Sequence, residues 1–380
     1  MNVSRDSVER LLAWFQENGR HELPWRQERT PYRVWVSEIM LQQTQVKTVL
    51  AYFSRFLSAF PDVCALAEAE EETVLRHWEG LGYYRRARQM HAAAKKVAEE
   101  RNGAFPETFE EILALPGIGR YTAGAILSFA LEKRFPILEA NTQRLFARLN
   151  GLELPVSAAP AQKILWGTAE EWISEKSWVS EKPWVSEKPS SVSPCTLNTA
   201  LMDLGSLVCT PQAPNCSACP LARECEALRM GRTAELPVSG KKMRYENRDE
   251  AAVLIFRKRN GEEEREVLLL RYVEGEWWAG LWDLPRTQLH SETICQELAD
   301  FVRRTTGLEI QVEEELQTFR HAVTRYRIRL RTFRAGELAE KAEKTLLERT
   351  PAGGEIRWVR ESELDRFPLC STGRKIAELL

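Results

Sequence analysis

Residues 108–131 read TFEEILALPGIGRYTAGAILSFAL, and this stretch predicts two helices joined by a tight turn. Apolar residues recur at helical spacing on either side of the turn, where Pro116, Gly117 and Gly119 interrupt the pattern. Glycines in such a turn let the backbone approach a phosphate closely, and the amides that begin the second helix can then face the anion. An ordinary corner between two helices also favours glycines, so the turn by itself leaves both interpretations open.

The sequence around this turn is helical in pattern from residue 1 to about residue 135. Glycines and prolines end the successive periodic stretches at Gly19, Pro61, Gly80 and Gly103. This half lacks strand-like alternation, so we expect an all-α domain. Its turn would form a helix–hairpin–helix, a motif that binds the DNA backbone without reading base sequence. The backbone at Gly117 and Gly119 would then contact the DNA.

The chain has 380 residues, which is too long for one compact core and predicts two or three domains. Hydrophobic residues make up 43% and charged residues 28%, as in ordinary soluble globular proteins. The start of the chain reads as an amphipathic helix, and no run of about eighteen apolar residues could span a membrane. We therefore expect a cytoplasmic protein without membrane partners. The net charge of −2 leaves nucleic-acid binding open, because binding needs only a local basic face.

Four of the eight cysteines lie in residues 209–225, CTPQAPNCSACPLAREC, with the spacing C-x6-C-x2-C-x5-C. Structural zinc sites usually combine two C-x2-C-like pairs separated by a longer stretch, and a cytosolic chain disfavours disulfides. Four thiolates in one short segment suit an iron–sulfur cubane, in which each iron takes one cysteine. The spacing therefore favours an iron–sulfur cluster over zinc, with the ligands Cys209, Cys216, Cys219 and Cys225.

Residues 172–189 read WISEKSWVSEKPWVSEKP, a six-residue unit that occurs three times. A period of six fits neither a solenoid nor a heptad, so we interpret the repeat as a tandem duplication in a surface loop. The alternative is that Trp178 and Trp184 are offered to a partner.

The composition changes after the cysteines. Residues 231–248 are polar and aperiodic, which predicts a linker between a domain at 1–230 and an α/β domain at 249–380. In the second domain, AAVLIFRKRNGEEEREVLLLRY (251–272) predicts a hairpin-like pair of strands. Residues 326–335 and 354–364 predict further strands, and residues 292–307 predict a helix.

The stretch PWRQERTPYRVWVSEIMLQQTQV (24–46) places Glu38 among apolar residues. Apolar surroundings raise the pKa of a carboxyl group, and a raised pKa suits a general acid. A capping role or an arginine partner would also explain a glutamate here. Gln42, Gln43 and Thr44 follow, and their side chains are of the types that bind base edges.

In this order, these motifs resemble the MutY adenine DNA glycosylases, which belong to the helix–hairpin–helix superfamily that also contains endonuclease III. The resemblance extends over nearly the whole chain and includes LPWR (23–26), TPYRVWVSEIMLQQTQV (30–46), GLGYYRRARQMH (80–91) and ALMDLGSLVC (200–209). It implies a glycosylase domain with a 4Fe–4S cluster in the loop at 209–225. The implied substrate is double-stranded DNA in which adenine is mispaired with 8-oxoguanine or guanine. The implied enzyme is a monomer, associated with the nucleoid if the source is bacterial.

The resemblance also implies roles for individual residues. Glu38 would protonate adenine N7 after the base has flipped out of the stack, and a second carboxylate would stabilise the positive sugar. Tyr121 falls where lyase-type relatives carry a Schiff-base lysine, which implies a monofunctional enzyme that leaves an abasic site. Arg26 and Asn141 would shape the site. Residues implied to probe or wedge the duplex are Leu41, Gln43 and Tyr83.

One departure from the family concerns that second carboxylate. The family has an aspartate in the sequence Asp-Gly-Asn, whereas residues 139–141 here are Glu-Ala-Asn. Glu139 is one methylene longer, and a displacement near 1 Å can cost about a hundredfold in rate. Ala140 also lacks glycine's backbone freedom. An active enzyme, a catalytically weakened mismatch-binding protein and a glycosylase of altered base specificity therefore stay open.

The second departure lies in the C-terminal domain, which resembles the MutT-like (Nudix) domain of the family through WWAGLWDLP (277–285). The positions of the metal-binding glutamates hold Phe301, Arg304 and Thr305, so we expect no diphosphate hydrolysis. In the family a Phe-Ser-His loop reads 8-oxoguanine, and residues 323–325 here are Val-Thr-Arg. Thr324 and Arg325 are the implied DNA contacts.

Alternating arginines follow this loop at positions 325, 327, 329 and 331, with Tyr326, Ile328 and Leu330 between them. On a strand the arginines would share one face. We hypothesise that this face contacts phosphates, and a solvated strand face is the alternative.

Overall fold

The computed structural model describes residues 3–174, 192–238, 240, 244–258, 264–336, 338 and 345–380. Trp178, Trp184 and most of the repeat lie outside these residues. The chain divides into two compact units, Met1–Ala67 with Ala92–Lys242, and Glu68–His91 with Met243–Leu380. No helix in the described part is long and apolar enough to cross a membrane. The domain boundaries at 230 and 249 remain a proposal.

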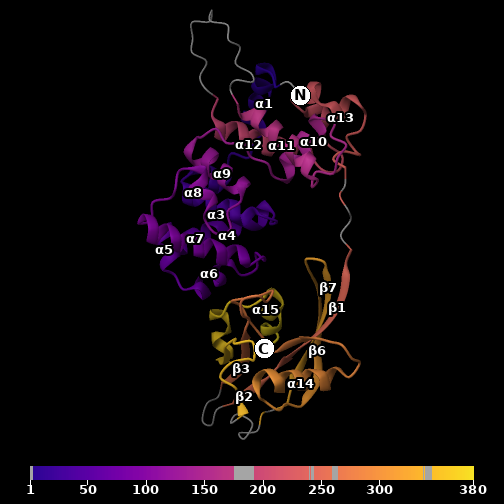
Figure 1. Cartoon of the computed structure of the whole chain (residues 1–380). Coiled ribbons are helices and arrows are strands. Elements are labelled where there is room, and N and C mark those ends of the chain that lie inside the picture. The colour runs from indigo at the N-terminus through magenta and orange to yellow at the C-terminus, as the bar shows by residue number, and fades with distance from the viewer. Residues whose placement is uncertain are drawn as a thin grey trace, which may run out of the picture. The chain divides into compact units, whose positions relative to one another are not determined.

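The predicted all-α region is confirmed, because the described residues up to 238 contain helices and turns but no strand (Figure 1). The helices are α1 (Arg5–Asn18), α2 (Pro24–Gln27), α3 (Pro31–Leu41), α4 (Val46–Ala59), α5 (Val63–Glu68), α6 (Glu71–Trp78), α7 (Arg85–Arg101), α8 (Phe109–Leu113), α9 (Arg120–Leu131), α10 (Ala140–Leu149), α11 (Ala159–Ile173), α12 (Pro194–Leu207) and α13 (Glu226–Arg229). Short 3-10 helices at Cys216–Ala218 and Ala222–Glu224 lie within the cysteine segment.

Residues 108–131 fold as the two helices α8 and α9, joined by a turn that contains Gly117 and Gly119. The Thr108 hydroxyl accepts a hydrogen bond from the Glu111 amide and caps α8, and Gly119 is the N-cap of α9. Gly117 has φ 75°, in the left-handed region that only glycine occupies freely. This is the geometry of a helix–hairpin–helix.

The beginning of the six-residue repeat is not a surface loop. Trp172 and Ile173 form the end of α11, and both side chains are buried in a core that α1, α10, α11 and α12 share. Burial of a tryptophan removes a large apolar surface from water and stabilises the helix end by about 2–3 kcal/mol. The surface-loop interpretation is therefore wrong for these two residues.

In the described residues from 244 onward, the strands form two four-stranded sheets. The strands are β1 (Glu246–Leu254), β2 (Phe256–Lys258), β3 (Arg265–Arg271), β4 (Trp282–Asp283), β5 (Arg286–Gln288), β6 (Val312–Val323), β7 (Tyr326–Ala335) and β8 (Ile356–Arg360). The first sheet has the order β5-β1-β7-β6, with β1 parallel to β7, and the second contains β2, β3, β4 and β8.

The predicted hairpin over 251–272 is only partly correct. Phe256–Lys258 pairs with β3, whereas β1 pairs with β5 and β7 in the other sheet. The chain changes sheets at Ile255, which lies between β1 and β2. Continuous apolar residues do not reveal such a switch, because they are buried in either sheet.

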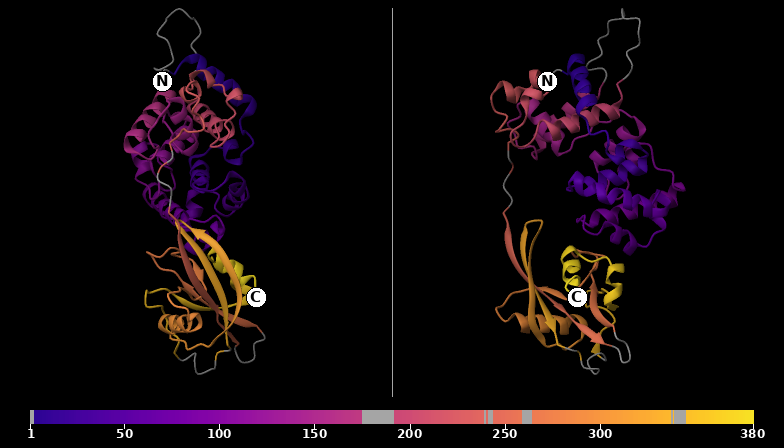
Figure 2. Two further views of the ribbon diagram at one scale, coloured as in Figure 1. Left: turned by 90° about the vertical axis from the view of Figure 1, so that its right-hand side faces the viewer. Right: turned by 180° about the vertical axis from the view of Figure 1, so that it is seen from behind.

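Two helices flank the first sheet. Alternate residues Ala251 and Val253 of β1 pack in one core with α14 (Ile294–Thr306), and Ala252 and Leu254 pack in another core, which includes α15 (Ser371–Ala377). Figures 1 and 2 show the two helices on opposite sides of this sheet. The alternation is the expected pattern of a sheet covered on both faces.

Candidate active site and DNA-contact residues

A cavity of about 740 Å³ lies among α2, α3, α9, α10 and α12. Seven of the predicted site residues line it together, although they are far apart in sequence: Arg26, Glu38, Leu41, Gln43, Tyr121, Glu139 and Asn141. Its size suits a flipped-out nucleobase with its sugar. The structure thus brings the implied catalytic residues into one site.

Glu38 lies in the middle of α3, a helix that begins with the Thr30 cap and Pro31 and whose residues 34–40 are all buried. The Tyr121 hydroxyl donates a hydrogen bond of 2.6 Å to Glu38 Oε2. Burial raises the pKa of Glu38 to about 7, the Tyr121 hydrogen bond opposes the rise, and the charge of Glu139 adds to it. Near neutral pH this carboxyl group can therefore hold a proton and donate it.

Glu139 is the N-cap of α10. Its Oε1 accepts a hydrogen bond from the Thr142 amide at 2.9 Å, and its Oε2 accepts from the Asn141 amide at 2.9 Å and from Asn141 Nδ2 at 3.0 Å. Burial raises the pKa of Glu139, while the bonds from these amides lower it. Amides at a helix start favour the charged form of a carboxyl group, and these three hydrogen bonds hold the longer side chain in one position at the cavity.

Ala140 does not need the conformational freedom of glycine. It is the first residue of α10, and it is absent from the described non-glycine residues with positive φ. The departure from Asp-Gly-Asn therefore costs no backbone strain at this position.

Asp203 on α12 is a site residue that sequence reasoning missed. Its carboxylate is fully buried, and it accepts hydrogen bonds from Arg26 Nη1 at 2.7 Å and Arg26 Nη2 at 2.9 Å, as well as from the Arg20 guanidinium and amide. Arg26 lines the cavity, and the hydrogen bonds from its Nη1 and Nη2 to Asp203 fix its position there. The sequence does contain an indication of this pair, because Asp203 lies in the apolar stretch ALMDLG. A carboxylate buried in such a stretch needs a cationic partner.

Comparison with known proteins decides the family. The profile described as "HhH-GPD superfamily base excision DNA repair protein" matches residues 36–170, and that of the NUDIX domain matches residues 252–379. An adenine DNA glycosylase of Buchnera aphidicola subsp. Acyrthosiphon pisum is 33% identical over 288 residues, which are 75% of each protein. The chain belongs to the adenine DNA glycosylases.

Other relatives of this adenine DNA glycosylase extend the comparison. The human adenine DNA glycosylase is 30% identical over 84% of this chain and 65% of its own length. The relative from Buchnera aphidicola subsp. Schizaphis graminum is 39% identical, and the alignment spans 62% of that protein. A solved structure described as a thermostable thymine-DNA glycosylase superposes with a TM-score of 0.50 and 25% identity, over 59% of this chain and 95% of that one.

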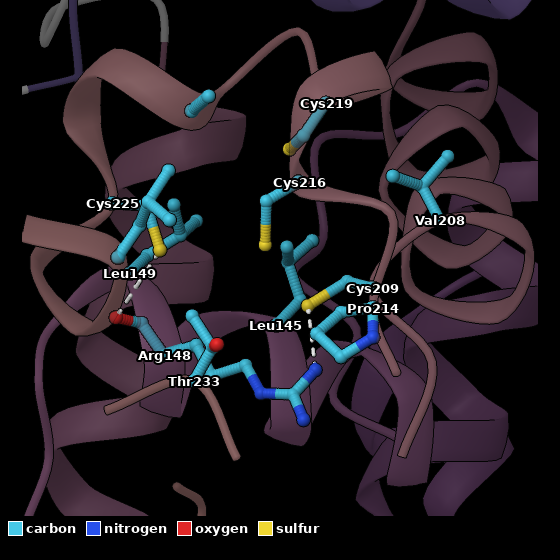
Figure 3. Close-up of a pocket in the computed structure, with 12 residues that line it drawn as sticks. Leu145, Arg148, Leu149, Val208, Cys209, Pro214, Cys216, Cys219, Cys225 and Thr233 are labelled. Carbon is cyan, nitrogen blue, oxygen red and sulfur yellow. Dashed lines mark hydrogen bonds between the residues drawn. The ribbon is translucent and has the colours of Figure 1, made fainter. Parts of the chain in front are cut away.

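In this adenine DNA glycosylase, the four clustered cysteines surround one small pocket beside α10 (Figure 3). All four are free thiols, and Arg148 donates a hydrogen bond of 3.3 Å to Cys209 Sγ. Burial and, to a smaller extent, the other three cysteines raise the pKa of Cys219 to about 12. Within the described ranges no three His, Cys, Asp or Glu side chains are grouped closely enough to hold a single metal ion.

Arg144 connects this pocket to the cavity. Its Nε donates to the Cys209 carbonyl at 2.7 Å, and its Nη2 donates to Asn141 Oδ1 at 2.8 Å. Asn141 in turn donates to Glu139. A continuous chain of hydrogen bonds thus joins the cysteine loop to the carboxylate that faces the cavity.

Three of the predicted DNA-contact residues have left-handed backbones. Gln43, Tyr83 and Thr324 have φ of 58°, 50° and 50°, respectively. Such conformations cost about 1–3 kcal/mol for non-glycine residues and concentrate at functional sites. Tyr83 is exposed, with its ring beside the Arg86 guanidinium, and Thr324 occupies the turn between β6 and β7.

The arginines after this turn are mostly ion-paired. Arg325 pairs with Glu246 at 3.2 Å, Arg329 with Asp249 at 2.6 Å, and Arg331 with Glu315. Arg325 lies in the turn itself, one residue before β7 begins. The predicted alternation holds from Tyr326 onward, since Ile328 and Leu330 are buried and Arg327 and Arg329 are exposed.

Proposed function

We propose that this protein is a monofunctional glycosylase that hydrolyses the N-glycosidic bond of adenine mispaired with 8-oxoguanine or guanine in double-stranded DNA. The observation that carries the proposal is the pairing of a carboxyl group of pKa about 7, Glu38, with a capped carboxylate, Glu139, in one cavity. Two carboxyl groups in different environments are what cleavage of a glycosidic bond requires.

In the proposed reaction, Glu38 transfers its proton to adenine N7 of the flipped base. The electron pair of the bond between C1′ and the base then leaves with adenine, and Glu139 stabilises the positive charge that develops on the sugar. Water adds to C1′ and loses a proton. Tyr121, which donates its hydrogen bond to Glu38, has no amine to attack C1′, so the product is an abasic site in an uncut strand.

We propose a 4Fe–4S cluster held by Cys209, Cys216, Cys219 and Cys225. The four free thiols fit it, because each iron of a cubane takes a separate cysteine and the thiols need not converge on one ion as for zinc. When bound, the cluster supplies structural order to the loop. Arg144 and Asn141 would pass that order to Glu139 through their hydrogen bonds.

The DNA contacts, the monomeric state and a location in the cytoplasm, at the nucleoid of a bacterium, are parts of the same proposal. Arg26, Leu41 and Gln43 would contact DNA at the cavity. The contacts proposed elsewhere are Tyr83, the backbone at Gly117 and Gly119, and the turn residues Thr324 and Arg325.

The test is single-turnover cleavage of matched duplexes that contain A·8-oxoguanine, A·guanine or thymine·guanine. We expect adenine release from the first two duplexes and no strand cut before alkali treatment. Thymine release instead would favour the altered specificity found in the structural relative that is described as a thymine-DNA glycosylase. Tight binding without release of any base would favour the mismatch-binding alternative.

A further inference from the structure

One face of the sheet that contains β1, β7 and β6 is apolar where α14 packs on it and charged beyond that helix. Ala251 and Val253 of β1 and Phe333 of β7 point to the α14 side and pack in its core. Beyond α14 the same face continues on β1, β6 and β7, which extend past the helix (Figure 1). Because side chains alternate along a strand, Asn247 and Asp249 lie on that face with Arg327 and Arg329.

This uncovered face is hollowed. A groove of about 640 Å³ is lined on it by Asn247, Asp249, Arg320, Ala322, Arg327 and Arg329. In the register of the hairpin, Ala322 is opposite Arg327 and Arg320 is opposite Arg329. The small Ala322 side chain therefore leaves room between longer neighbours.

Four arginines and one aspartate line the groove. Arg248, which alternates to the other face of β1, is paired with Glu250 at 2.6 Å. Arg329 is paired with Asp249 at 2.6 Å. Arg320 and Arg327 are exposed, and in the described part of the chain neither forms an ion pair. The Arg327 guanidinium instead lies 4.4 Å above the ring of Tyr245, which is 53% exposed.

His321 also borders the groove but adds no charge. Burial and, to a smaller extent, the positive charges of Arg286 and Lys375 lower its pKa to about 4. Near neutral pH, two unneutralised cations therefore remain in an open groove.

We propose that this groove binds the phosphodiester backbone of nucleic acid through Arg320 and Arg327. The two arginines are diagonal neighbours across the hairpin, since Arg320 is opposite Arg329 and Arg327 is two residues before Arg329. Their long side chains lie on one face of the sheet, so both can reach phosphates of one strand. A guanidinium fork binds phosphate oxygens in a bidentate manner, and such contacts hold the backbone without reading its sequence.

We commit to a nucleic-acid strand as the occupant, because DNA is the substrate of the proposed function and its backbone presents phosphates in a row. The groove residues flank the turn residues Thr324 and Arg325 on both sides but do not include them. The inference therefore adds a contact to the proposed function, on which it rests.

The test compares the salt dependence of binding to an undamaged duplex for the full-length wild type and the double variant Arg320→Ala/Arg327→Ala. Each phosphate contact contributes about 0.9 to the slope of log K against log salt, so we expect the slope to fall by about 1.8. The matched control is Arg303→Ala/Arg366→Ala, which removes two exposed arginines that pair with Asp300 and Glu363 in the same region. The control should keep the wild-type slope.

An unchanged slope in the groove variant, or an equal fall in the control, would overturn the inference. Single-turnover adenine release at saturating enzyme separates this outcome from failure of the proposed function. If the wild type releases no adenine but the salt dependence of binding is still weaker in the groove variant, the proposed function is wrong and the phosphate contact is supported. If the wild type releases adenine and the two proteins have equal salt dependence, the function is supported and only the phosphate contact is wrong.

Discussion

At the scale of single residues, the pKa of Glu38 predicts how excision depends on pH. In the proposed reaction Glu38 acts as an acid, so it must be protonated, and its pKa is raised to about 7 mainly by burial. The single-turnover rate should therefore fall about tenfold per pH unit above this value. In the same proposal Glu139 is ionised, so the rate should also fall on the acid side, and burial, which raises the pKa of Glu139, moves that fall to higher pH. A rate that keeps rising from pH 7 to pH 9 would contradict the assignment of Glu38.

Glu139 offers a matched pair of substitutions. Glu139→Asp keeps the charge and a favoured N-cap residue, so we expect excision within about tenfold of wild type. Glu139→Gln keeps the length but loses the charge that stabilises the sugar cation, so the rate should fall by about 10²–10³-fold. Single-turnover rates on an A·8-oxoguanine duplex measure both, and a fully active Glu139→Gln would show that this carboxylate is not used.

At the scale of elements, α10 and α12 approach each other where the site is built. A Cβ at Gly205 of α12 would lie 2.8 Å from the Asn141 carbonyl oxygen on α10. Gly205→Ala should therefore push the helices apart, destabilise the fold by about 1–3 kcal/mol and lower excision through Asn141 and Glu139. Chemical denaturation and single-turnover kinetics measure the two effects.

Gly167 is the control for this prediction. It lies within α11, and a Cβ there meets nothing within 4 Å. Gly167→Ala should stabilise the protein by about 0.5–1 kcal/mol and leave the excision rate unchanged. Equal stability changes for the two alanines would contradict the close approach at Gly205.

The sequence predicted elements best where the pattern is local. Helices α8, α9 and α14 follow from apolar periodicity and glycine stops, and β7 follows from strict alternation. Strand β6 was missed, because VEEELQTFRHAV is exposed along most of an edge strand and shows no apolar face. The switch of β1 between sheets was missed because it depends on distant partners.

The resemblance to the family identified the candidate site residues, but only the structure shows which of them contact one another. Glu38, Tyr121 and Glu139 come from three separate segments, and sequence spacing alone could not place them at one cavity. The Asp203–Arg26 pair spans 177 positions and depends on how α12 packs. The sequence also did not predict that Glu139 caps α10, because glutamate is not a usual N-cap residue.

At the scale of the whole molecule, the cysteine loop should carry about four iron atoms per chain as purified. Cys219→Ser should lower the iron content and the thermal stability together, because the loop packs against α10 and α12. Cys64→Ser, at a cysteine outside the loop, should change neither. Iron and sulfide analysis with thermal melting checks this, and stoichiometric zinc in place of iron would contradict the proposed cluster.

We propose that adenine leaves from this cavity because Glu38 protonates it. The most direct test of this proposal is the single-turnover release of free adenine from an A·8-oxoguanine duplex by the wild type and by Glu38→Gln, with duplex binding measured in parallel. We expect adenine release by the wild type and a loss of about 10²–10⁴-fold in the release rate of the variant, with duplex binding retained. Adenine release by Glu38→Gln at the wild-type rate would contradict the proposal.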